Sequence, residues 1–299
     1  MKLFIDIGII VITVLMMLTV GLDLKRKSLS ALLKNRASVT FLLLCHLVIP
    51  PLVGIIIVLL IPMRAELAAA ILLLAACPIG DIANLYTIMA RGNPALSLTL
   101  NAITCLLAPL SMLLVFAVLN VIGLEHTFLA VPASTLLGRL ALFLFLPVTI
   151  GALIAFKMHN VGCLIRPFLH RFVGIGILMM LSVIIYSQWE TVKQNGLPFA
   201  LTCFAFMTGC LSCGLVCNRF LRLPPSSAHA SLLCFPVRNV GVASLIAITL
   251  LGRIDYASVA AVYFIVEVPL LLLLVWILRS GFITRDSSKS KMLKLNPRS

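Results

Sequence analysis

Long apolar runs separated by short polar loops make up most of the chain. Each run matches the length of about 20 residues that a helix needs to cross the hydrocarbon core of a bilayer. The pattern predicts nine transmembrane helices, over residues 4–22, 38–60, 66–90, 95–122, 134–156, 168–188, 197–217, 227–251 and 256–279. The predicted fold class is therefore an all-α polytopic membrane protein with about nine spans.

The third predicted span is interrupted at its centre. In the segment LLLAACPIGDIANLYTIMARGNPALSL, residues 72–98, the apolar run contains Pro78, Gly80, Asp81 and Asn84. Proline breaks a helix, and unwound backbone at membrane depth survives only where it is buried in protein or lines a wet cavity. We therefore expect this interruption to form half of a substrate or ion site.

The eighth predicted span is interrupted in the same way. The segment SSAHASLLCFPVRNVGVASLIAITLLG, residues 226–252, carries Pro236, Arg238, Asn239 and Gly241 near its centre. The third and eighth spans cross the membrane in opposite directions. Broken helices at corresponding places of two oppositely oriented halves are typical of an inverted-repeat secondary transporter.

This interpretation divides the chain into two repeats within one membrane domain. The first repeat covers residues 1–123, the second covers 132–280, and residues 281–299 form a basic tail. The second repeat has five spans and the first has four, so the missing member of the first is expected to precede Met1. We interpret the first apolar run as a span and not as a signal peptide, because the LKRK after it is a stop-transfer flank and no cleavage motif follows.

The charge distribution predicts the orientation. The net charge is +14, and most Lys and Arg residues lie in the loops after the first, third, fifth and seventh spans and in the C-terminal tail. The positive-inside rule makes these loops cytoplasmic, with the N-terminus outside and the C-terminus inside. Topology explains the charge, so no nucleic-acid partner is expected. The short loops are typical of a bacterial inner-membrane protein, and the tail is expected to contact anionic lipids.

Nine cysteines lie almost entirely inside predicted spans, where a disulfide framework is not expected. Cys210, Cys213 and Cys217 share one face of the seventh span. They form either a soft-metal site or apolar packing, and packing is preferred because that span has no His or carboxylate. The chain shows no nucleophile with a positioned base and no phosphate loop, so it is not expected to be an enzyme, and it needs no cofactor.

The segments CPIGDIANLYTIMARGNPALSLTLNAITCLLAP and FPVRNVGVA resemble the paired motifs of the bile acid:sodium symporter family. GLDLK and HLVIPP extend the similarity over essentially the whole chain. The resemblance implies a panel domain and a core domain, with two helices crossing at their unwound centres. It also implies sodium at the crossing, an organic anion such as a bile acid or a smaller carboxylate between the domains, and transport by alternating access.

The resemblance also assigns positions to the first sodium site, and only some of them keep the ligands that the family has there. Its matching positions are Ala83, Asn84, Ser97 and Asn101, of which Asn84 and Ser97 keep the usual oxygen ligands. Cys234 stands where the family has an acidic residue that serves both sites. The first site therefore loses an anionic ligand.

The second sodium site departs further from the family. Its matching positions are His46, Phe235, Val237 and Arg238, where the family has amides at the first and last. Sodium needs hard oxygen ligands, and a fixed guanidinium repels a second cation. We infer that at least the second sodium site is absent.

Arg238 has three interpretations. It can pair with Asp81, which stands where the family has a small neutral residue, and so replace the ion-bridged crossover. It can bind a substrate carboxylate, or it can extend to the cytoplasmic interface. If Arg238 pairs with Asp81, replacing Arg238 alone with Gln should impair folding or transport more than replacing both residues with neutral ones.

Further polar residues in the spans also keep two interpretations. Asn84 and Asn239 can cap half-helices or face the cavity as ligands. Glu267 can couple transport to protons or be a neutral acid bonded to a neighbouring helix, and Asp81 and His46 are rival proton sites. The other histidines are expected to be solvated at the surface: His126, His159, His170 and His229.

The function predicted from sequence is secondary transport of a small organic anion, with coupling to sodium or to protons left open. Asn84, Ser97, Asn101, Asn239 and Arg238 are the expected site residues. One alternative is an arsenite-type metalloid-anion permease that uses Cys77 or Cys234. Another is a binding or sensor protein that keeps the fold without transport.

Overall fold

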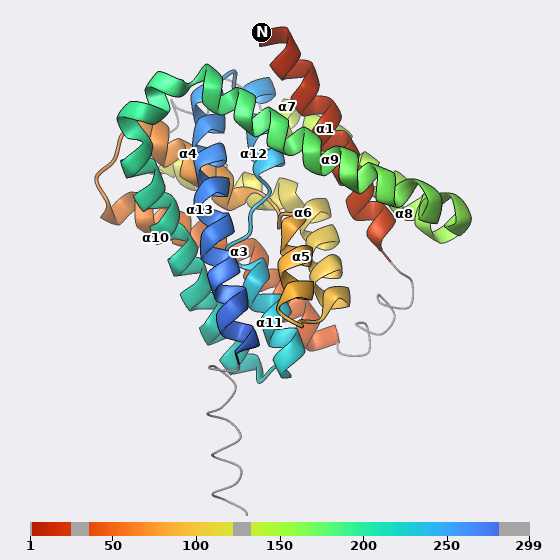
Figure 1. Cartoon of the computed structure of the whole chain (residues 1–299). Helices are drawn as coiled ribbons and strands as arrows, with labels where there is room; N and C mark the ends of the chain where they lie inside the picture. The colour runs from red at the N-terminus through yellow and green to blue at the C-terminus, as the bar shows by residue number, and fades with distance from the viewer. Residues whose placement is uncertain (1, 25–35, 122–132, 281–299) are drawn as a thin grey trace, which may run out of the picture.

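The computed structural model describes residues 2–24, 36–121 and 133–280, and these are almost entirely helical (Figure 1). The first part contains α1 (Lys2–Asp23), α3 (Arg36–Leu60), α4 (Ala65–Ala76), α5 (Ile82–Met89) and α6 (Pro94–Val121). The second part contains α7 (Ala133–Leu140), the π-helix η2 (Ala141–Phe145), α8 (Leu146–Lys157), α9 (His159–Ser187), α10 (Trp189–Leu221), α11 (Pro225–Cys234), α12 (Val240–Leu245), the π-helix η3 (Ile246–Leu250) and α13 (Ile254–Arg279). The basic tail lies outside the described residues.

The helices follow the predicted spans closely. Within the described ranges, seven helices are long and apolar enough to cross a membrane. The third and eighth predicted spans are the two interrupted ones, α4 with α5 and α11 with α12 and η3. The all-helical polytopic membrane fold predicted from the sequence is confirmed.

Two helix boundaries differ from the prediction. α9 begins at His159 and not at residue 168, and α10 begins at Trp189 and not at residue 197. The sequence places the polar residues between 157 and 167 in a loop, but the helix continues through Pro167. Arg166 and His170 on this part of α9 contact the Asp23 carboxylate at the end of α1.

The helices form two groups. α1 packs mainly against α8 and α9, whereas α3, α10 and α13 pack around the interrupted helices (Figure 1). α1 and α9 carry nearly the same hexapeptide, LMMLTV at 15–20 and LMMLSV at 178–183. Such a likeness is expected of corresponding helices in two repeats. The two groups correspond in position to the expected panel and core.

Two glycines allow α1 and α8 to pack closely. A Cβ atom added to Gly21 would lie 2.1 Å from the Val148 carbonyl oxygen, and one added to Gly151 would lie 2.2 Å from the Leu18 carbonyl oxygen. Small residues at helix interfaces are a main source of association between membrane helices, because they let the backbones approach. The α1–α8 contact therefore depends on the absence of side chains at these two positions.

We expect Gly151→Val to separate α1 from α8 and to lower the thermal unfolding temperature of the purified protein. Overpacking of this kind costs about 1–3 kcal/mol. Gly174→Val on α9 is the matched control, since nothing lies within 4 Å of a Cβ built there. Equal unfolding temperatures for the two variants would contradict the assigned role of Gly151.

Candidate functional site

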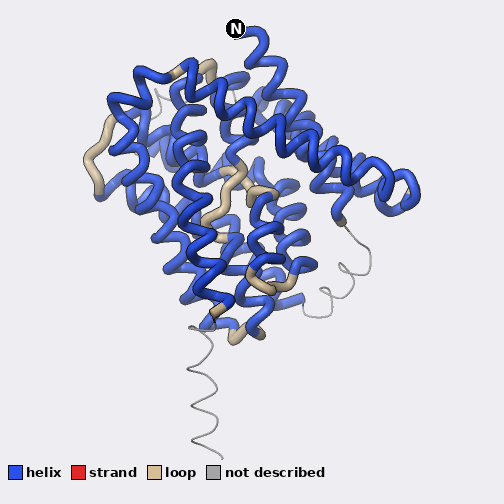
Figure 2. Tube along the Cα trace, viewed as in Figure 1, coloured by secondary structure: helices blue, strands red, loops and turns tan. Residues whose placement is uncertain are grey.

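The two interrupted helices meet at their unwound centres in the middle of the protein (Figure 2). An isolated antiparallel bridge joins them: the Gly80 N–H donates to the Val237 carbonyl at 3.2 Å, and the Asn239 N–H donates to the Pro78 carbonyl at 2.9 Å. Buried backbone groups must find partners. Each interruption therefore satisfies backbone groups that the other leaves without helical partners.

A chain of polar side chains connects the first interruption to α6 and α11. The Ser97 hydroxyl donates to Asn84 Oδ1 at 2.6 Å and lies 3.4 Å from the Cys234 sulfur. The Asn101 amide donates to Asp81 Oδ1 at 2.7 Å. The structure thus brings together several of the positions matched to the first sodium site, and adds the Asp81 carboxyl group to them.

The expected ion pair between Asp81 and Arg238 is absent, and this prediction was wrong. The Asp81 carboxyl group contacts Asn101 on α6. Arg238, which is 3% exposed, extends the other way and donates to the carbonyl oxygens of Ala75 and Cys77 at the end of α4. Although the two interruptions touch through their backbones, their charged side chains point to different neighbours.

Three other predicted residues are buried: Asn239, His46 and Glu267. Asn239 is the N-cap of α12, and its Oδ1 accepts from the Val242 N–H at 3.0 Å, which confirms the capping interpretation. The His46 ring packs on Phe235 with 4.0 Å between centroids, and neither ring nitrogen has a hydrogen-bond partner among the described residues. Glu267 likewise has no partner there, so the expected hydrogen bond to a neighbouring helix is not present.

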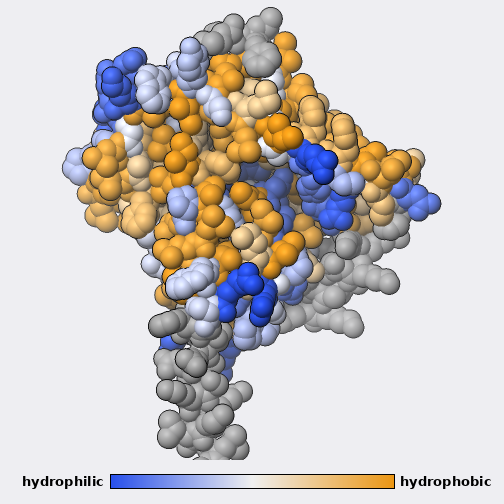
Figure 3. All heavy atoms as spheres, viewed as in Figure 1, coloured by the Kyte–Doolittle hydropathy of each residue, from blue (hydrophilic) through white to orange (hydrophobic). Residues whose placement is uncertain are grey.

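A cavity of about 560 Å³ opens between the two helix groups, bounded by α1 and α9 on one side and by α5 and α6 on the other. Figure 3 shows a hollow lined by hydrophilic residues on this face, below α9. The polar side chains that line the cavity are Asp23, Asp81, Asn84, Cys163, Arg166 and His170. Asp81 and Asn84 come from the first interrupted helix, so the crossover region contributes directly to this space.

Asp23, Arg166 and His170 form a charged cluster on the cavity wall that the sequence analysis missed. Arg166 Nε lies 2.5 Å from Asp23 Oδ1, and His170 Nε2 lies 3.0 Å from the same oxygen. The Asp23 side chain is 9% exposed, whereas those of Arg166 and His170 are 35% and 43% exposed. The carboxylate therefore holds both basic groups while leaving part of each open to the cavity.

A sequence signal for this cluster exists. Arg166 and His170 are four residues apart, the spacing that places two side chains on one helix face. The prediction put them in a loop and at its edge, and it assigned His170 to the solvated surface. His229 was assigned in the same way, but its Nδ1 lies 3.0 Å from the Ala90 carbonyl oxygen.

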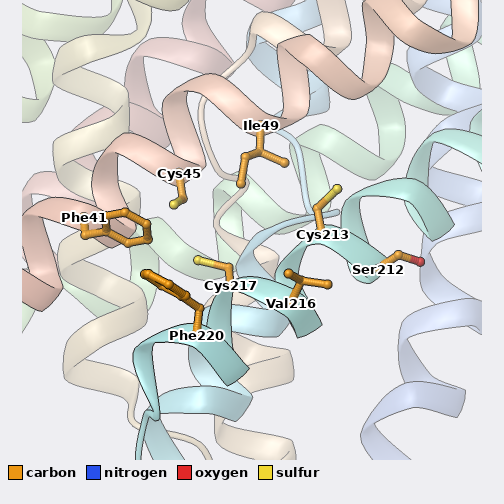
Figure 4. A pocket seen from close by; sticks show the side chains of 8 residues that line it. All are labelled: Phe41, Cys45, Ile49, Ser212, Cys213, Val216, Cys217 and Phe220. Carbon is orange, nitrogen blue, oxygen red and sulfur yellow. The ribbon is translucent and has the colours of Figure 1, made fainter.

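A second hollow, of about 530 Å³, lies between α3 and α10 and contains three thiols (Figure 4). Cys45 from α3 faces Cys213 and Cys217 from α10, with phenylalanine rings beside them. Cys210 does not line this hollow. Within the described parts of the chain, no three His, Cys, Asp or Glu side chains are placed to hold a metal ion. The described residues therefore give the soft-metal interpretation of the α10 cysteines no support.

Comparison with known proteins places the chain among membrane transporters. A family model described as the Sodium Bile acid symporter family matches residues 10–195. The chain is 25% identical over 234 residues to a protein of Bacillus subtilis (strain 168) described as the uncharacterized sodium-dependent transporter YocS. That alignment covers 78% of this chain and 71% of the relative. The family match includes most of α1, the first interrupted helix, α6 and all of α9, which together line the cavity.

Proposed function

The chain belongs to the sodium bile acid symporter family, and from this premise we propose that it is a secondary transporter that moves a small organic anion across the membrane by alternating access. The substrate is a bile acid-like molecule or a smaller carboxylate. Rocking of the group containing α1, α8 and α9 against the group around the crossover would expose the cavity to each side in turn.

The observation that carries this proposal is the cavity between the two helix groups. Its α9 wall presents Arg166 and His170, and its opposite wall presents Asp81 and Asn84 from the interrupted helix. A guanidinium group matches the two oxygens of a carboxylate in its planar fork geometry. Because Arg166 is only partly covered by Asp23, its remaining donors can bind the anionic group of a substrate.

The coupling ion is proposed to bind beside Asp81. The Asp81 carboxyl group and the oxygens of Asn84 and Ser97 are hard ligands of the kind that sodium prefers. Asp81 also lines the cavity, so it can exchange protons with water. Glu267 and His46 do not line this cavity and are fully buried, which makes them weaker coupling residues than Asp81.

The positive-inside rule places the loop after α1 and the loop after α5 in the cytoplasm. The cavity is lined by Asp23 at the end of α1 and by Ile88 near the end of α5. We therefore propose that the structure represents an inward-facing state. The proposed location is the inner membrane of a bacterium.

We expect Arg166→Gln to weaken anion binding by about tenfold or more, since a hydrogen bond to a charged group contributes about 1.5–3 kcal/mol. Cholate and a panel of small monocarboxylates would be screened by their effect on thermal unfolding, because a ligand of the folded state raises its stability. Uptake of each stabilising compound would then be measured in proteoliposomes.

Arg171→Gln is the matched control, because Arg171 lies on the same helix, is exposed, and does not line the cavity. Equal anion binding by Arg166→Gln and Arg171→Gln would contradict the assignment of Arg166 to the anion site. Binding without uptake under any ion gradient would contradict transport and favour a sensor on the same fold.

A further inference from the structure

Arg238 is a buried cation whose partners are backbone carbonyl groups. Its guanidinium group donates to the carbonyl oxygens of Ala75 and Cys77, and it makes no ion pair with a carboxylate among the described residues. The titratable side chains that interact with it electrostatically are thiols, a phenol and an imidazole: Cys77, Cys105, Cys210, Cys234, Tyr263 and His46. Within the described ranges, no side-chain anion therefore balances its positive charge.

The carbonyl groups that Arg238 contacts belong to the end of a half-helix. α4 ends at Ala76, and the chain then unwinds at Cys77 and Pro78. The last four carbonyls of a helix have no partner within it, and together they carry a partial negative charge of about half an electron. In transporters with broken helices, such ends and the unwound carbonyls beside them coordinate the coupling cations.

We propose that the Arg238 side chain is a built-in cation that permanently occupies the place of a bound coupling ion at the C-terminal end of α4. The guanidinium group, carried by the second interruption, binds the carbonyls of Ala75 and Cys77 at the first, and so links the two segments. Unlike an ion, it cannot dissociate during the transport cycle. The term coupling ion in this inference rests on the proposed transport function. The contacts of Arg238 with the α4 carbonyls do not depend on that function.

The other half of the crossover is built differently. Gly80 follows Pro78 by two residues, as Arg238 follows Pro236, so the first interruption has no side chain at the corresponding position. At the end of α11, the Tyr263 hydroxyl donates to the Pro236 carbonyl. After α11, the hydrogen-bond donor to the unwound carbonyl is thus a neutral phenol, whereas at the end of α4 it is a guanidinium group. A mobile coupling ion is accordingly left to the Asp81 side of the crossover.

The test is chemical rescue of Arg238→Ala in the full-length, detergent-purified protein. Thermal unfolding would be measured in sodium, potassium or guanidinium chloride at constant ionic strength, with guanidinium kept at millimolar concentrations that do not denature proteins. We expect the variant to unfold at a lower temperature than the wild type and to be restored in part by guanidinium. The wild type should show no such rise. A response to guanidinium no greater than the response to potassium would overturn the proposal.

Arg139→Ala is the matched control, because Arg139 also donates to a backbone carbonyl, that of Thr249 at 3.2 Å, but lies at the surface. It should show no guanidinium rescue. If Arg238→Ala does not accumulate, the stabilities of Arg238→Lys and Arg238→Met are compared instead. A stable lysine variant and an unstable methionine variant would show that the site requires a positive charge. Equal stability of these two variants would overturn the proposal.

The unfolding measurements use no substrate, so they separate this proposal from the proposed function. Rescue by guanidinium with no anion uptake would support the built-in cation and contradict the transport function. Anion uptake without rescue would support transport and contradict the built-in cation.

Discussion

Gly80→Ala is expected to destabilise the folded protein by about 1–3 kcal/mol, the usual cost of overpacking a tight interior. A Cβ atom at this position would lie 2.9 Å from the Arg238 carbonyl oxygen and 3.1 Å from a methyl group of Val237. The Gly80 N–H also donates to the Val237 carbonyl, so moving the segment apart would strain a buried hydrogen bond. Gly80→Val should be more damaging still, because the crossover has no space for its methyl groups.

Gly241→Ala provides a matched comparison in the second interrupted helix. Its Cβ atom would also meet a neighbour at 2.9 Å, but that neighbour is the terminal methyl group of Met16, which can move. Thermal unfolding of both purified variants would measure the difference. If Gly241→Ala were as destabilising as Gly80→Ala, the close backbone approach at the crossover could not be the cause.

The crossover could be predicted from the sequence because its signals are local. A proline beside glycine and polar residues at the centre of an apolar run indicates a break, whereas the lone prolines Pro109 and Pro269 lie inside continuous helices. A span of some 20 residues can be recognised from hydropathy alone. Pro78 and Pro236 therefore marked both interruptions. The membrane also excludes unpaired backbone, so two such breaks are expected to meet in the interior.

The partners of the charged side chains could not be predicted in the same way. Asp81 and Arg238 lie on facing segments, and their opposite charges suggested a pair. Which way each side chain extends depends on the helices around it: α6 offers the Asn101 amide to Asp81, and the end of α4 offers carbonyls to Arg238. This information lies in tertiary packing and not in the spacing of the two residues.

The charged wall of the cavity was missed for a related reason. Hydropathy leaves Arg166 in a loop and His170 at the start of the predicted span 168–188, because polar residues lower the mean hydropathy over any window that contains them. On the helix they face Asp23 and the cavity, where their polarity is satisfied. Polar residues that line an internal cavity extend a transmembrane helix beyond the limits that an average over its length can detect.

Asp81→Asn is expected to abolish the dependence of uptake on an ion gradient, whichever ion drives it. If sodium binds beside Asp81, the substitution removes the anionic ligand at this position, where Cys234 already lacks a charge. A loss of about 1.5–3 kcal/mol for one interaction with a charged group corresponds to about 10- to 100-fold in ion affinity. If a proton is the coupling ion, an amide cannot accept it, and the coupling is lost outright.

The measurement is uptake into proteoliposomes with a sodium gradient, a proton gradient or neither. Asp255→Asn is the control, since Asp255 pairs with Arg253 at the start of α13, with Nη2 and Oδ2 2.7 Å apart, and does not line the cavity. This variant should keep the response of the wild type. If Asp81→Asn kept undiminished gradient-driven uptake, the coupling site could not lie at Asp81. Glu267 would then be the next residue to neutralise, because it is fully buried and has no hydrogen-bond partner in the described structure.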